Sequence, residues 1–157
     1  MPIEKDKVDK FNGFVKKAFE EVTSELVETG YKATESVQSQ ATSKIVIIIG
    51  ICGKSKGRII LESDLETAGK FAVAMNFGDA LDDPKDLYLY IAEFANMFCG
   101  RATTYANNEY KDREFWLTPP AIFSAEDLEI TSPSIQSETV CYSGNEGIFL
   151  IDIGFEG

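Results

Sequence analysis

Glu93 and Asn96 are the residues of this chain whose types and spacing could support chemistry on a bound substrate. They lie in the stretch 86–105. There, apolar residues recur every three or four positions and predict a long helix with one apolar side: Leu87, Ile91, Phe94, Phe98, Ala102 and Tyr105. Glu93 and Asn96 fall on the opposite side of this helix, so a carboxylate and a carboxamide one turn apart would both face solvent.

The other side chains on this polar face are short. An ordinary solvated helix face carries Lys, Glu and Arg, and this one does not. Gly100 costs about 1 kcal/mol relative to alanine in a helix, which indicates that another molecule approaches the backbone there. The alternative is a plain solvated surface. We predict a partner-docking surface that surrounds the pair and consists of five residues: Leu89, Ala92, Cys99, Gly100 and Thr103.

Composition disfavours several classes of function. A net charge of −11 argues against partners such as nucleic acid and anionic membranes, which need basic surfaces. The chain has no histidine, which removes His-based triads, and Cys52, Cys99 and Cys141 are too far apart for a Cys-x-x-Cys site. No apolar run approaches 18 residues, and Met1–Asp6 has no signal core. We expect one cytoplasmic domain over residues 1–157, with no metal site and no membrane partner.

Three helices are predicted around this face. The first spans Lys7–Thr29, where apolar residues follow a helical period and Gly30 is a stop signal. The second spans Asp64–Phe77, and Asp64 is expected to cap it by accepting a hydrogen bond at Thr67. The third is the central helix, Asp86–Asn107.

Strands are predicted as two hairpins and short flanking segments. The first hairpin joins Lys44–Cys52, expected to be covered on both faces, to Arg58–Leu61. Its glycine-containing connection lacks a Gly-Lys-Ser/Thr ending and a following helix, so a turn is favoured over a phosphate-binding loop. The second hairpin joins Ile135–Ser143 to Gly147–Phe155. Short strands are expected at 31–34 and 113–117, and an irregular connection at 124–134.

The chain also contains a weak internal repeat. Each hairpin follows a long amphipathic helix, and the first helix carries Asp9-x-x-Asn12 where the central helix carries its Glu-x-x-Asn pair. Lys16 stands where the central helix has Gly100, so the first copy is interpreted as structural. The predicted fold class is therefore α+β, with a mostly antiparallel sheet, two long helices on one face and halves related by a pseudo-twofold axis.

One string resembles the signature of a known family. Glu93-x-x-Asn96-Met97-x-x-Gly100-x-Ala102 is similar to the motif of the CheX/CheC-type chemotaxis phosphatases, which dephosphorylate the phospho-aspartate of a response regulator. Further similar segments are 11–14, 57–61, the Pro119-Pro120 pair and the closing hairpin. Gly13 departs from relatives that often have proline or alanine there. The resemblance implies a CheC-like fold and a CheX-like protein with one site.

The resemblance also implies roles for the pair. Glu93 and Asn96 would be catalytic: Asn96 would position the hydrolytic water, and Glu93 would pair with a lysine of a phosphorylated CheY-like response regulator. Mg²⁺ would be supplied by the regulator, and this chain would bind no cofactor. A catalytically inactive adaptor for a response regulator or a flagellar-switch-type partner is the alternative. A homodimer is one option for assembly, and no nucleic acid is expected to bind.

Overall fold

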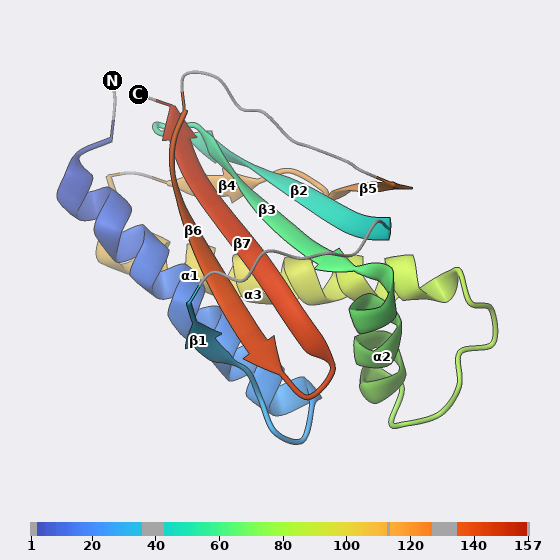
Figure 1. The fold of residues 1–157 in the computed structure, drawn as a ribbon. Coiled ribbons are helices and arrows are strands. Elements are labelled where there is room, and N and C mark those ends of the chain that lie inside the picture. Colours follow the sequence, from blue (N-terminus) through green and yellow to red (C-terminus); the bar gives the residue numbers. More distant parts are fainter. Residues whose placement is uncertain (1–2, 36–42, 113, 127–134, 157) are drawn as a thin grey trace.

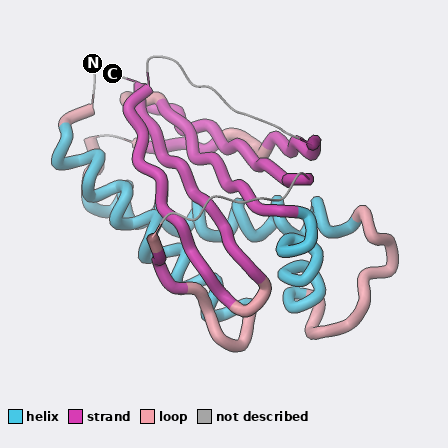
Figure 2. Tube along the Cα trace, viewed as in Figure 1, coloured by secondary structure: helices cyan, strands magenta, loops and turns pink. Residues whose placement is uncertain are grey.

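A seven-stranded sheet forms one layer of the molecule, and the two long helices α1 and α3 form the other (Figure 1). Figure 2 shows the helices together on one face of the strands. The structure is a computed structural model that describes residues 3–35, 43–112, 114–126 and 135–156. Every strand pairing among these residues is antiparallel. The predicted α+β class and its antiparallel sheet are therefore confirmed.

The sheet follows the order β1-β6-β7-β3-β2-β4, and β5 also pairs with β2. Its bounds are Lys32–Thr34 for β1, Ser43–Gly53 for β2, Gly57–Asp64 for β3, Phe115–Leu117 for β4, Ala121–Glu126 for β5, Ile135–Gly144 for β6 and Gly147–Glu156 for β7. The strands β7 and β3 pair at the centre, and each is followed outward by its own hairpin partner. This order agrees with two related halves that meet between β3 and β7.

The helices begin and end for local reasons. Helix α1 spans Lys5–Leu26 and ends three residues before the predicted position, because Val27 is already extended. Helix α2 spans Leu65–Met75, and the Asp64 carboxylate accepts a hydrogen bond of 2.6 Å from the Thr67 backbone N–H, as predicted. Helix α3 spans Asp86–Glu109 and runs slightly past the predicted end.

Aromatic rings join the two layers. Phe19 of α1 is fully buried, and its ring lies 5.4 Å from that of Phe94 and 5.2 Å from that of Phe98, both on α3. On the sheet side it stacks on Tyr142 of β6, with ring centroids 4.3 Å apart. The ring of Phe149 of β7 lies 5.6 Å from that of Phe94 and 5.2 Å from that of Phe71 on α2. This cluster sets the position of α3 relative to the sheet.

Two sequence-based predictions about strands need correction. The segment from Ser124 onward was expected to be irregular, yet β5 continues to Glu126 because it pairs with β2 along its whole length. The remaining part of that expected connection, 127–134, lies outside the described residues. The strand 44–52 was expected to be covered on both faces, but only one face packs on helices. On the other face Val46 is buried while Cys52 is exposed.

Replacing Phe19 tests the importance of the aromatic cluster. Phe19→Ala should lower the free energy of unfolding by about 3–5 kcal/mol, because it removes a fully buried ring and leaves a cavity. Urea unfolding followed by circular dichroism measures this loss. Trp116→Ala is the control, because its ring is 64% exposed and its loss should cost less than about 1 kcal/mol. Equal losses in the two variants would contradict the prediction.

Candidate functional site

The solvent-facing side of α3 is a narrow row of residues that we call the α3 stripe. Its members are four exposed residues and the partly exposed glycine between them: Leu89, Glu93, Asn96, Gly100 and Thr104. Successive members are three or four positions apart, so they follow one side of the helix. The opposite residues Ile91, Phe94 and Phe98 are fully buried. The predicted exposure of the pair and the predicted burial of the apolar side are both confirmed.

The Glu93 carboxylate and the Asn96 carboxamide are available for an external ligand. Both side chains are exposed on adjacent turns of α3. Neither has a hydrogen-bond or ion-pair partner within the part of the chain that the structure describes. An acceptor-only group and a group that both donates and accepts hydrogen bonds thus stand side by side in solvent.

Gly100 leaves open space beside the pair. A Cβ atom built at this position meets no atom within 4 Å outside the helix itself. The glycine is therefore not required by packing inside the molecule, although it weakens the helix relative to alanine. This agrees with the expectation that the small residue serves an approach from outside.

Three residues of the predicted docking surface face inward instead. Ala92 and Thr103 are each 7% exposed, and Cys99 is fully buried. Assigning them to the docking surface was wrong. The buried Thr103 hydroxyl has a hydrogen-bond partner within the helix, because it donates a hydrogen bond of 2.7 Å to the Cys99 carbonyl.

Contacts with β4 and β5 explain why the side of α3 that carries Ala92, Cys99 and Thr103 is covered. The Tyr88 hydroxyl is 3.2 Å from the Ser124 hydroxyl of β5, and the Asn107 side chain bonds both the N–H and the carbonyl of Phe115 in β4. These contacts keep β4 and β5 against the flank of α3. A helical wheel contains no information about such neighbouring strands. The exposed row therefore includes Thr104 in place of the predicted Thr103, and the sequence analysis missed Thr104. Its position four residues after Gly100 was the available signal.

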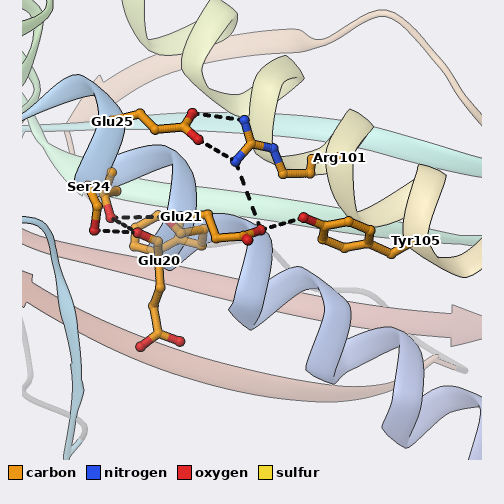
Figure 3. A network of polar contacts seen from close by, with 8 residues as sticks. Glu20, Glu21, Ser24, Glu25, Arg101 and Tyr105 are labelled. Carbon is orange, nitrogen blue, oxygen red and sulfur yellow. Dashed lines mark hydrogen bonds and ion pairs between the residues drawn. The ribbon is translucent and has the colours of Figure 1, made fainter.

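A polar seam between α1 and α3 borders the stripe on its other flank (Figure 3). The Arg101 guanidinium donates two hydrogen bonds, of 2.9 and 2.8 Å, to the Glu25 carboxylate. The Tyr105 hydroxyl donates a third, of 2.6 Å, to Glu21. The hydrogen bonds from Arg101 lower the pKa of Glu25. These groups are partly exposed to solvent, so the seam aligns the helices more than it stabilises them.

With this geometry established, a comparison with protein-family models finds one match. The model described as "Chemotaxis phosphatase CheX" covers residues 45–143, which include most of β2, all of β3 and α3, and most of β6. The chain belongs to the CheX family. The family model therefore contains the whole α3 stripe.

Solved structures share the fold of this CheX-family chain. A CheC-like superfamily protein from Shewanella sp. PV-4 matches with a TM-score of 0.79 and 20% identity, over 94% of this chain and 98% of that chain. CheX from Vibrio vulnificus matches with a TM-score of 0.77 and 18% identity, over 93% and 96%. The CheX–CheY–BeF3–Mg²⁺ complex from Borrelia burgdorferi matches with a TM-score of 0.74 and 23% identity, over 98% and 100%.

A search among curated proteins finds no match to the chain. Among the helices of the described residues, none is long and apolar enough to cross a membrane.

The first copy of the motif has a structural role in this CheX-family fold. Asn12 is only 3% exposed, and its amide donates a hydrogen bond of 2.8 Å to Glu138 of β6. Lys16 pairs with the same carboxylate at 2.7 Å. These two hydrogen bonds, that from Lys16 being the stronger influence, lower the pKa of Glu138. The Asn12 side chain, at the position that corresponds to Asn96, is therefore buried against β6 and does not face solvent.

The three thiols should differ in reactivity because they differ in burial. Cys52 is exposed, whereas Cys99 and Cys141 are buried, and burial raises the pKa of the Cys99 thiol. Iodoacetamide should therefore label Cys52 alone in the native protein and all three cysteines in urea. Mass spectrometry of tryptic peptides measures the labelling. The variant Cys52→Ser should remain unlabelled until it unfolds, and native labelling of Cys99 would contradict its buried position.

Proposed function

We propose that this CheX-family chain dephosphorylates the aspartyl phosphate of a CheY-like response regulator, with residues 1–157 acting as one phosphatase domain. One observation carries the proposal. Glu93 and Asn96 lie exposed and unpartnered, within the described part of the chain, on a helix row whose other members are small or apolar. Such a row can enter a concave active site of another protein, because no long charged side chain holds the two surfaces apart.

The choice of partner is supported by a relative. The Borrelia burgdorferi complex contains CheX together with CheY, BeF3 and Mg²⁺, and its CheX shares the fold of this chain. The net charge of −11 agrees with a protein partner and not with nucleic acid. A CheY-like regulator is therefore the partner that we propose for the α3 stripe.

Asn96 is proposed to position the attacking water. Hydrolysis of an acyl phosphate forms a bond from the water oxygen to phosphorus while the bond from phosphorus to the aspartate oxygen breaks, and the carboxylate leaves with the bonding electrons. The Asn96 carbonyl oxygen can accept a hydrogen bond from the water and direct a lone pair of the water at phosphorus. A carboxylate in the same place would repel the phosphoryl oxygens. The proton of the water ends on the released phosphate or in solvent.

Glu93 is proposed to fix the register of α3 in the regulator's active site. It lies one turn before Asn96 on the same row, and its carboxylate has no partner among the residues that the structure describes, so it can pair with an external cation. A lysine beside the phospho-aspartate would pair with it at short range, in a contact that loses water as the two surfaces close. That pairing would set the distance from the Asn96 carboxamide to phosphorus. Mg²⁺ would be held by the regulator and would neutralise the phosphoryl oxygens.

Asn96→Ala separates catalysis from binding. We expect the single-turnover rate of phosphate release to fall by about 100-fold or more, because the water loses its positioning group. Affinity for the regulator should change little, since the carboxamide contributes geometry more than contact area. Asn108→Ala is the matched control, because Asn108 is an exposed asparagine near the far end of the same helix, more than three turns after Asn96.

Two outcomes would count against this proposal. Unchanged phosphate release by Asn96→Ala would remove Asn96 from the mechanism. If the wild type binds phosphorylated regulators and hydrolyses none of them, the adaptor hypothesis replaces the phosphatase.

Gly100→Lys tests close approach at the stripe. The position has open space around its Cβ atom, and lysine favours a helix more than glycine does, so thermal stability should stay the same or rise. Regulator binding and phosphate release should both be lost, because the ammonium group keeps α3 out of the active site. Isothermal titration and phosphate release measure the two effects. Gly100→Ala, which adds one methyl group, should keep most of both activities, and full activity of Gly100→Lys would contradict close docking.

A further inference from the structure

The turn between α2 and α3 presents an aromatic ring to solvent. Phe77 is 95% exposed, more than any other large apolar side chain described in the structure. Its ring contributes almost nothing to the packing of this chain, because almost none of its surface is removed from water. The fold by itself therefore gives no reason for phenylalanine at this position.

The backbone of Phe77 adopts a conformation that disfavours phenylalanine. Its φ angle is +59°, in the left-handed region where a bulky side chain is an outlier. The turn is a Schellman motif: the Phe77 N–H donates to the Ala74 carbonyl at 3.2 Å, and the Gly78 N–H donates to the Val73 carbonyl at 2.9 Å. Glycine is the usual residue at the position that Phe77 occupies. An exposed ring is thus held at a site where folding favours no side chain.

Hydrogen bonds attach this turn to the helix of the candidate site. The Asn76 side chain accepts a hydrogen bond of 3.0 Å from the Tyr90 hydroxyl and donates to the carbonyls of Asp79 and Ala80. Tyr90 lies on α3 one turn before Glu93. The turn that carries Phe77 is therefore tied to the N-terminal part of α3, where Leu89 is itself 67% exposed.

We propose that Phe77 and Leu89 form an apolar anchor that seats against an apolar patch of the response regulator, next to the site that Glu93 and Asn96 enter. This inference rests on the proposed function, because it takes the same partner. Two observations favour that occupant. Leu89 is the first residue of the α3 stripe, and the turn that carries Phe77 is hydrogen-bonded to the next residue, Tyr90. The exposed residues Asp79 and Asp82 follow Phe77 in the chain, and their carboxylates would complement a basic border around the partner's apolar patch.

The anchor would select among regulators. The groups at the phosphorylation site are set by chemistry that all aspartyl-phosphate regulators share, so the Glu93 and Asn96 pair cannot distinguish one from another. An apolar patch beside that site can differ between regulators without affecting the chemistry. Phe77 and Leu89 therefore determine affinity and specificity, while the turnover of bound regulator depends on the pair.

Phe77→Gly separates the anchor from the fold. The melting temperature should rise by about 2–4 °C, because glycine relieves the left-handed strain. Affinity for a CheY-like regulator loaded with BeF3 and Mg²⁺ should weaken by about tenfold or more. The size of this loss should change little with salt concentration, because the contact that is removed is apolar. The rate of phosphate release at saturating regulator should stay within about twofold of wild type. Phe77→Leu keeps an apolar side chain and should retain most of the affinity.

The control and the contrary outcomes are specific. Phe123→Thr removes another exposed ring, which lies on the sheet face away from α1 and α3, and it should leave affinity unchanged. Unchanged affinity of Phe77→Gly, with an active wild type, would overturn the anchor and leave the proposed function intact. A wild type that binds the BeF3-loaded regulator but releases no phosphate from the phosphorylated regulator would overturn the proposed function, and the anchor would then be tested by the affinity measurements alone.

Two further results would also overturn the anchor. If the wild type binds no loaded regulator, both proposals fall together. If Phe77→Gly changes the molecular mass in sedimentation and leaves regulator affinity unchanged, the ring serves association between copies of this chain.

Discussion

The aromatic packing around Phe19 is the interaction on which the rest of the structure depends. It joins α1 to Phe94 and Phe98 on one side and to Tyr142 on the other, so the two helices and the sheet share one core. Because those rings turn one side of α3 inward, the opposite side must face solvent. The exposure of the Glu93 and Asn96 pair is therefore a consequence of the core, and any change that rotates α3 would move the pair with it.

The two long helices carry the same short motif, but its asparagine is buried in α1 and exposed in α3. Both helices carry an acidic residue followed three positions later by asparagine, and both pack on the same sheet. In α1 the asparagine is buried and hydrogen-bonded to Glu138 of β6, and Lys16 pairs with the same carboxylate at the partly exposed surface. In α3 the equivalent Asn96 is exposed beside a glycine. A motif of this kind acquires a function only where the tertiary structure leaves its face open.

The free energy of this fold is distributed unevenly around the candidate site. The rings that pack against α3 are fully buried and dominate stability, whereas the polar seam from Arg101 to Glu25 and Glu21 lies at the partly exposed surface and contributes little. The stripe itself adds almost nothing, and both Gly100 and the backbone of Phe77 weaken their local elements. The surface proposed for docking is therefore the part of the molecule that folding alone explains least.

The sequence by itself determined the helices, the two hairpins, the antiparallel α+β class and the exposed pair, because each depends on local periodicity or turn chemistry. Asp64 was predicted as a cap from residue types alone, and the structure agrees. Tertiary structure decided which residues flank the pair. Cys99 and Thr103 look exposed on a helical wheel, yet β4 and β5 cover their side of α3, while Thr104 faces solvent. Neighbours distant in sequence bury a helix face, and a periodic pattern within one helix contains no information about them.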